Sequence, residues 1–262
     1  MNLGLTDKVA LVAGGTSGIG AAAARVLAAE GARVSVCGRS LDGLDQIQAE
    51  IKDLTGADIL PVQADFSRRE DIERYVQQTV DHFGGVDILV NSVGSSMFGS
   101  FDQVPDERWV SDTNLKLFGA VRACRAVIPH LRKRGGGRIV HVAGNSGKQP
   151  YMWHYPGGAA NAALLNFTNA LAQELCSDNI LVTAICPGPV ETRRLRDQIT
   201  ALGKLWNMPR PEAERHFYDS QPLKRAATAE EVAYLIAFLV SDKASYISGT
   251  AITIDGCISK GI

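Results

Sequence analysis

A glycine-rich turn near the start of the chain constrains the fold more than any other stretch. The turn follows a short apolar run over 9–13 and precedes an alanine-rich segment over 19–30 that has the composition of a helix. Its glycines, Gly14, Gly18 and Gly20, permit a sharp change of direction and let backbone N–H groups approach a bound anion. A strand, a glycine turn and a helix in this order predict the phosphate-binding corner of a dinucleotide fold.

The rest of the chain repeats the same alternation of apolar strands and helices. Runs of Val, Ile and Leu without polar alternation are typical of parallel strands buried on both faces. The predicted strands are 9–13, 33–37, 59–64, 86–91, 138–142, 181–186 and 251–254, and the predicted helices are 19–30, 41–54, 70–83, 106–131, 156–176 and 229–240. We therefore expect one α/β domain over 1–262, a Rossmann-type, doubly wound parallel sheet of about seven strands with helices on both faces.

Composition argues against several other classes of protein. The 262 residues are 45% hydrophobic, enough for one large core, and a net charge of −1 gives no reason to expect a nucleic-acid or membrane partner. The first residues lack the charged and apolar regions of a signal peptide, and no apolar run reaches the roughly 18 residues of a membrane span. The five cysteines lack metal-ligand spacing. We expect a cytoplasmic protein without a metal that acts on a small molecule.

The second predicted strand ends in residues that bear on the choice of nucleotide. An Asp or Glu at this place binds the 2′-hydroxyl of NAD(H), but this chain has Arg39 followed by Ser40. A guanidinium and a hydroxyl suit a 2′-phosphate, which favours NADP(H) over NAD(H). The alternative is that Arg39 is a solvated turn residue stacked on adenine, with NAD(H) bound. Asp65, after the third strand, is a candidate partner of the adenine amine or an ordinary turn residue.

Five motifs in the expected order resemble the short-chain dehydrogenase/reductase superfamily, in its shorter form, over nearly the whole chain. They are the glycine turn over 14–20, Asn91-Ser92-Val93-Gly94, Asn114, Pro187-Gly188-Pro189-Val190-Glu191-Thr192, and the segment 248–256. The resemblance implies that Pro187, Gly188 and Thr192 hold the nicotinamide carboxamide. It also implies that Asn114 holds a water in a proton relay, and that the protein forms a homodimer or homotetramer.

The expected cofactor contacts combine the turn, the strand ends and these motifs. They are Gly14, Thr16, Ser17, Gly18, Ile19, Gly20, Arg39, Ser40, Asp65, Asn91, Gly94, Asn161, Pro187, Gly188 and Thr192.

The resemblance breaks down where the family carries its proton chemistry. Members place a Ser after the fifth strand, a Tyr thirteen residues later and a Lys four residues after the Tyr. The Lys and the cofactor's charge lower the pKa of the Tyr phenol, and the Ser binds the same substrate oxygen. In this frame Gly144 stands at the Ser, Gly157 at the Tyr and Asn161 at the Lys. Lys148, the one lysine of the segment, precedes its Tyr-x-x-x pairs, so no shift of register restores Tyr-x-x-x-Lys.

Nearby side chains are candidates to replace the lost groups. Tyr155 is our first candidate for a relocated acid, acting as a hydrogen-bond donor because no lysine lowers its pKa; the alternative is a packing role. Ser146 is a candidate donor to a substrate oxygen, and His154 titrates near neutrality. His141 is expected to be structural. The expected catalytic set is Asn114, Ser146, Tyr155 and Asn161, around the vacated positions Gly144 and Gly157.

The segment 193–223, after the sixth predicted strand, is expected to be an insert that closes over the substrate. Its aromatic residues, among them Trp206 and Phe217, suit an apolar or aromatic ligand, and its prolines divide it into short pieces. The sequence thus predicts an atypical NAD(P)H-dependent oxidoreductase that reduces a ketone, enone or iminium. Two alternatives stay open: a non-redox lyase, cyclase or isomerase on the same frame, and a non-catalytic NADP(H)-binding subunit.

Overall fold

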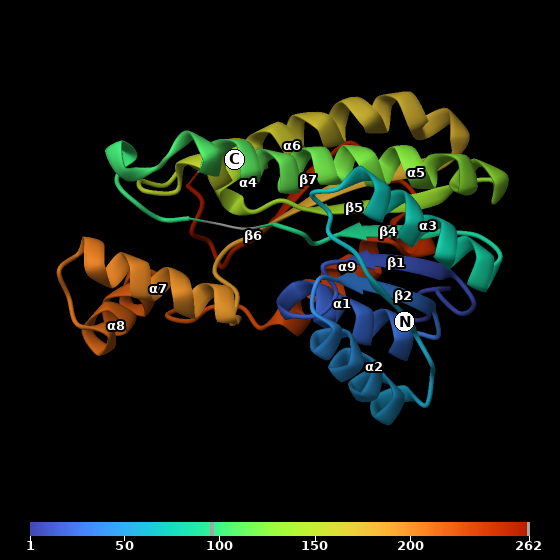
Figure 1. Cartoon of the computed structure of the whole chain (residues 1–262), viewed down its shortest axis with the longest axis horizontal. Coiled ribbons are helices and arrows are strands. Elements are labelled where there is room, and N and C mark those ends of the chain that lie inside the picture. Colours follow the sequence, from blue (N-terminus) through green and yellow to red (C-terminus); the bar gives the residue numbers. More distant parts are fainter. Residues whose placement is uncertain (95–96, 261–262) are drawn as a thin grey trace.

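A single seven-stranded parallel sheet organises the protein (Figure 1). The computed structural model describes residues 1–94 and 97–260. The strands are β1 (Val9–Ala13), β2 (Arg33–Gly38), β3 (Leu60–Gln63), β4 (Ile88–Asn91), β5 (Gly137–Val142), β6 (Ile180–Pro187) and β7 (Ala251–Ile254). They lie in the order β3-β2-β1-β4-β5-β6-β7, which confirms the predicted doubly wound sheet. The third strand begins one residue later than predicted, where its ladder starts with Leu60 opposite Ser35.

Helices cover both faces of the sheet (Figure 1), and the central strands are largely buried on both sides. The helices α1 (Gly18–Ala29), α2 (Leu41–Thr55) and α9 (Ala229–Leu239) share one core with residues such as Ala10 and Val12. The helices α3 (Arg69–Phe83), α5 (Gly119–Lys133) and α6 (Tyr155–Leu175) share the other with Val9 and Leu11. Alternate residues of β1 thus belong to opposite cores, as the pleat of a strand requires.

The long helix predicted over 106–131 is interrupted. α4 (Asp106–Thr113) passes into a π-helical turn, Asn114–Phe118, before α5 begins. A π turn adds a residue to the helical repeat and so changes which side chains face the sheet, and such turns are frequent at functional sites. One consequence is that Lys116, within this turn, is buried.

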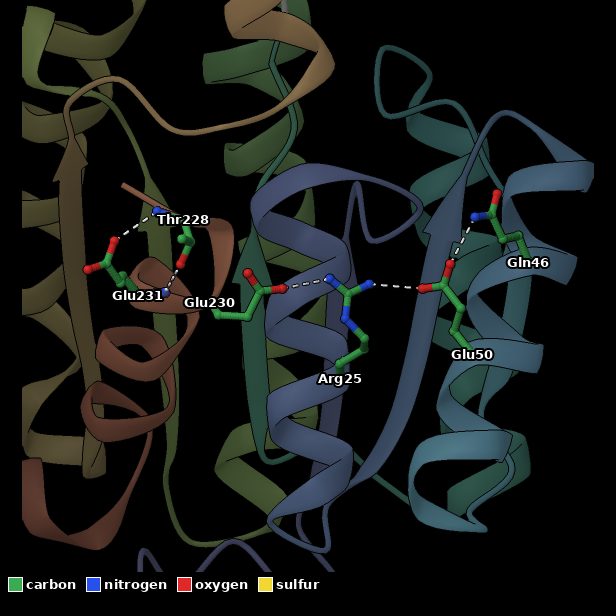
Figure 2. A network of polar contacts seen from close by, with 6 residues as sticks. All are labelled: Arg25, Gln46, Glu50, Thr228, Glu230 and Glu231. Atoms are coloured by element: carbon green, nitrogen blue, oxygen red, sulfur yellow. Dashed lines mark hydrogen bonds and ion pairs between the residues drawn. The ribbon is translucent and has the colours of Figure 1, made fainter. Parts of the chain in front are cut away.

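A polar network fixes α1 and therefore the glycine turn that precedes it. The guanidinium of Arg25 in α1 forms ion pairs with Glu50 of α2, at 2.9 Å, and with Glu230 of α9, at 3.0 Å (Figure 2). The first turn of α9 is closed by a capping box, in which the side chains of Thr228 and Glu231 accept each other's backbone N–H groups (Figure 2). One arginine thus ties together three helices on the same face of the sheet.

Two helices after β6 project away from the sheet, α7 (Arg193–Leu205) and α8 (Arg210–Ser220), drawn in orange in Figure 1. They have an apolar cluster of their own, centred on Leu195, Ile199 and Phe217, against which Phe98 and Trp153 pack. Across the described part of the chain, no helix combines the length and apolar character needed to cross a membrane.

Candidate active site

A cavity of about 860 Å³ opens at the carboxyl ends of the central strands. Its volume is in the range of small-molecule and cofactor sites, and it lies where β1 and β4, neighbours in the sheet, lead to helices on opposite faces. Its walls include thirteen of the predicted site residues: Gly14, Thr16, Ser17, Gly18, Ile19, Arg39, Asp65, Gly94, Ser146, Asn161, Pro187, Gly188 and Thr192. Gly144 also lines it, whereas Gly20, Ser40, Asn91, Asn114, Tyr155 and Gly157 do not.

The glycine turn has the shape of a phosphate cradle. A β-carbon at position 20 would lie 2.2 Å from the carbonyl oxygen of Gly14, and one at position 14 would lie 2.9 Å from that of Ser92. Gly14 also has a φ of 71°, which favours glycine. Ser17, at the N-cap of α1, forms no side-chain cap bond, and the first turn holds no acidic residue. The N–H groups at this helix start therefore remain suited to a pyrophosphate, so the residues present fit a dinucleotide.

The polar side chains at the ends of β2 and β3 differ in whether they already have hydrogen-bond or ion-pair partners within the protein. Arg39 is exposed on the cavity wall and forms no ion pair with any described residue. The hydroxyl of Ser40 instead caps α2, accepting from the N–H of Gly43 at 3.2 Å. Asp65 lines the cavity, but its Oδ1 accepts from both the N–H and the hydroxyl of Ser67. Arg39 is thus the most available anion-binding side chain at this end.

The structure places Asn114 outside the cavity wall, and the water-holding role that the resemblance implies stays a prediction. Its amide nitrogen donates to the carbonyl oxygen of Ser67 at 3.1 Å, and its amide oxygen accepts from Arg122 at 2.9 Å. Both ends of the side chain are therefore occupied by structural bonds. Asn91 is likewise buried, with its amide nitrogen 3.1 Å from Nδ1 of His141. The structural role expected for His141 agrees with its complete burial.

Two glycines, Gly144 just after β5 and Gly157 in the first turn of α6, have no room for a side chain. Gly144 has a φ of 133°, at which a side chain is strained, and a β-carbon there would lie 2.8 Å from Nδ2 of Asn161. A β-carbon at Gly157 would lie 2.2 Å from Nε2 of His154. Asn161 donates from Nδ2 to the hydroxyl of Ser146 at 2.9 Å, and its Oδ1 lacks a hydrogen-bond partner among the described residues.

Tyr155, the first candidate for a relocated acid, lies outside the cavity wall. It is the first residue of α6, and its ring lies edge to face with Phe101, the centroids 5.6 Å apart. Two residues of an α-helix differ by about 200° in direction, so Tyr155 faces away from the side on which position 157 lies. The contact with Phe101 favours the packing alternative for Tyr155, and its role as a relocated acid stays a prediction.

His154 fills the space beside Gly157. Its ring stacks on Phe98, with centroids 4.6 Å apart and planes 6° apart. Burial, reinforced by the charges of Arg194 and Lys116, lowers the pKa of His154 to about 4, so the ring is neutral near pH 7. Both ring nitrogens are covered and have no hydrogen-bond partner within the described chain.

Lys116 is the site residue that sequence reasoning missed. It lines the cavity from the π turn, and its Nζ donates to the carbonyl oxygen of Val142 at 2.6 Å. Burial and the charge of Arg194 lower the pKa of the Lys116 ammonium from 10.5 to about 7, against a smaller effect of Cys186. In a regular helix residue 116 would point about 200° away from Asn114, so nothing in the sequence pattern assigned it to the site.

Comparison with known proteins defines the class to which this site belongs. Residues 8–202 match the model of the family described as short chain dehydrogenase, so the chain belongs to that family. Over 256 residues it is 37% identical to dehydrogenase/reductase SDR family member 4 of Bos taurus, covering 96% of this chain and 87% of the relative.

Two solved structures show the same architecture. L-sorbose reductase from Gluconobacter frateurii, complexed with NADPH and L-sorbose, has a TM-score of 0.94 and 34% identity over 100% of both chains. Levodione reductase has a TM-score of 0.92 and 30% identity over 96% of this chain and 97% of its own. The protein is therefore an oxidoreductase of the short-chain dehydrogenase type. Within the described residues, no group of three or more His, Cys, Asp or Glu is arranged to hold a metal.

Proposed function

We propose that the protein uses NADP(H) to reduce a carbonyl group, or an activated double bond, in a small apolar or aromatic substrate. The observation that carries the proposal is one continuous cavity, which joins the glycine cradle to the apolar wall of α7 and α8. Leu202, Trp206 and Phe217 belong to that wall. Bound in the cradle, a reduced nicotinamide would supply a hydride to the substrate carbon.

We further propose that Gly144, Gly157 and Asn161 stand at the positions where the family carries Ser, Tyr and Lys. The support is their spacing in the sequence, together with the contact of Asn161 with both Gly144 and Ser146. On this assignment the family's phenol and ammonium are missing at their usual places. Proton transfer then depends on other cavity residues, and Asn161 keeps only the capacity to bind neutral groups such as ribose hydroxyls.

We propose that residues 1–262 form one nucleotide-binding domain and that residues 193–223 are its substrate lid. The lid assignment is supported by the separate apolar cluster of α7 and α8, which lets these helices move against the sheet without opening the main cores. The resemblance also leads us to propose a homodimer or homotetramer in solution.

The preference for NADP(H) is tested at Arg39. Charge-assisted hydrogen bonds contribute about 1.5–3 kcal/mol, so Arg39→Ala is expected to raise the Kd of NADPH about tenfold to hundredfold. The Kd of NADH should change little, since NADH has no 2′-phosphate. Fluorescence titration of both nucleotides measures the difference. Arg33→Ala is the matched control, because Arg33 begins the same strand and its guanidinium has polar contacts only with Asp7 among the described residues. An equal loss for both nucleotides would contradict the assignment.

The reaction is tested by NADPH consumption with L-sorbose, levodione, phenanthrenequinone and a cyclic enone. We expect turnover with at least one, and transfer of deuterium from C4-deuterated NADPH into the product. Tight NADPH binding without consumption across the panel would contradict a reductase. Substrate conversion without a change in nicotinamide absorbance would indicate non-redox chemistry instead.

A further inference from the structure

The π turn brings a lysine to the cavity at the point where the proposed reaction lacks a proton donor. A β-carbon at Gly94 would lie 3.1 Å from Nζ of Lys116 and 3.6 Å from Nη1 of Arg194. Gly94 is one of the expected cofactor contacts, and Val142, whose carbonyl oxygen accepts from Lys116, is the last residue of β5. The ammonium thus lies between two strand ends that border the expected nicotinamide site.

Burying the side chain of Lys116 at this position is unfavourable for the stability of the protein. Among the described residues, the one hydrogen bond of its ammonium is to a neutral carbonyl oxygen, and no carboxylate forms an ion pair with it. Burying an ammonium without an opposite charge costs several kcal/mol, so ordinary packing favours a methionine or leucine at such a position. A buried, unneutralised lysine on a cavity wall is therefore more consistent with chemistry than with stability.

The other polar groups of the cavity are less able to transfer a proton. Both ring nitrogens of His154 are covered, and its pKa of about 4 leaves it with no proton to spare near pH 7. The pKa of Tyr151 is raised to about 12, by burial first and by Asp255 second. The hydroxyl of Ser146 accepts from Asn161 and keeps its O–H free to donate a hydrogen bond, but an aliphatic hydroxyl does not release its proton near pH 7. Of these four side chains, Lys116 is the one whose pKa, at about 7, lets it exchange a proton readily near neutral pH.

We propose that Lys116 is the catalytic proton donor to the substrate oxygen, taking over from another helix the role that Gly157 and Asn161 no longer fill. This inference rests on the proposed function. As the carbonyl carbon gains the hydride, the electron pair of the C=O π bond moves to oxygen. An N–H bond of the Lys116 ammonium breaks and an O–H bond forms, which leaves an alcohol and a neutral amine. The amine regains its proton from water. The carbonyl oxygen of Val142 orients the ammonium throughout.

The surroundings of Lys116 bring the pKa of its ammonium into the range that this proton transfer requires. With a pKa of about 7 it is divided between ammonium and amine near neutral pH, where general acid catalysis is most effective. The charges of Arg194 on α7 and Cys186 on β6 influence the pKa of Lys116. The charge of Lys116 in turn lowers the pKa of His141 on β5 and of His154 just before α6. Only Lys116 among them is poised to titrate near pH 7.

The first test is the pH dependence of carbonyl reduction. For the wild type, with whichever panel ketone it reduces, kcat is expected to fall about tenfold per pH unit above about pH 7, as the ammonium is lost. Lys116→Met is expected to lower kcat about 100-fold or more and to remove this alkaline limb. Lys116→Arg keeps the charge without titrating, so its profile should be reduced and flat. The Kd of NADPH, measured by fluorescence, should change less than threefold in both variants.

Lys148→Met is the matched control. Lys148 also donates to a backbone carbonyl oxygen at 2.6 Å, that of Ala251, but it is exposed and does not line the cavity. Its kcat profile should match that of the wild type. A purely structural Lys116 would also alter stability on substitution, but it would leave the alkaline limb in place.

The second test needs no substrate. The folded pKa of Lys116 is depressed, so the penalty for burying its charge is complete below about pH 7 and is relieved as pH rises toward the unfolded value. Lys116→Met is therefore expected to have a Tm several degrees above the wild type at about pH 6, and the difference should shrink by about pH 9. Lys148→Met should show no such pH-dependent difference.

The outcomes distinguish a failure of the proposed reductase function from a failure of the role of Lys116. A wild type that binds NADPH but reduces none of the panel would overturn the proposed function and, with it, this role. An active wild type whose Lys116→Met variant keeps the rate and the alkaline limb would overturn only the role of Lys116. A Tm difference that does not depend on pH would overturn the titration on which the donor depends.

Discussion

Replacing Gly20 with alanine is expected to abolish measurable NADPH binding. The added β-carbon would lie 2.2 Å from the carbonyl oxygen of Gly14 and 2.8 Å from its carbonyl carbon, so the glycine turn must move. Gly14 cannot yield toward the sheet, because its own α-carbon faces the carbonyl oxygen of Ser92. The backbone N–H groups of the turn would then no longer all point toward the bound phosphates. We expect the Kd of NADPH to rise at least about 100-fold, roughly 2.8 kcal/mol.

Loss of binding must be distinguished from loss of fold in that variant. Overpacking of this kind costs about 1–3 kcal/mol of stability, so the Tm of Gly20→Ala should also fall. Ala28→Gly is the control, since Ala28 is a buried residue at the other end of α1 and glycine destabilises a helix by about 1 kcal/mol. It should lower the Tm while leaving the Kd of NADPH unchanged. Wild-type binding by Gly20→Ala would contradict the cradle.

The nucleotide half of the site was predictable because its determinants are local in sequence. The turn from Gly14 to Gly20 needs glycines for close contacts within itself and with neighbouring segments such as Ser92. The strand before it and the helix after it make it recognisable in the sequence. The sheet was predictable for a related reason. The central strands are largely buried on both faces and therefore consist mostly of apolar residues, with few polar exceptions such as His141 and Thr183.

The proton-transfer half was not predictable in the same way, because small shifts of helix register decide it. The sequence predicts that α6 begins at Pro156, whereas it begins one residue earlier, which carries Tyr155 around to Phe101. The π turn likewise directs Lys116 to the cavity. The signal for a π turn lies in tertiary contacts, such as that of Lys116 with Val142, rather than in residue type.

Asn114 is a residue of the family motif whose side chain has structural partners in this protein. The residue is present and lies in the expected helix, but its amide joins Ser67 to Arg122. Arg122 lies in α5, two turns further along. If the lysine partner is absent from position 161, as we propose, the water relay it would serve has no acceptor there. The amide is then available to stabilise the loop after β3.

The two adjacent glycines at the start of α6 provide a sharp test of what fills the position proposed for the missing tyrosine. A β-carbon at Gly157 would meet the His154 ring at 2.2, 2.9 and 3.0 Å, whereas one at Gly158 would meet only the carbonyl oxygen of Ser146, at 3.8 Å. Gly157→Ala must therefore expel the imidazole from its stack on Phe98, at a cost of about 1–3 kcal/mol. Gly158→Ala should stabilise the helix by up to about 1 kcal/mol.

Thermal unfolding should therefore move the two variants in opposite directions. About 1 kcal/mol corresponds to roughly 2–4 °C for a chain of this size, so the two Tm values should differ by several degrees. His154→Ala in the Gly157→Ala background should recover part of the loss, because removing the ring removes the collision. Equal Tm shifts, or no recovery, would contradict the placement of His154. For the same reason, Gly157→Tyr combined with Asn161→Lys is expected to require removal of the His154 imidazole as well, since the ring occupies the space in which a tyrosine side chain would begin.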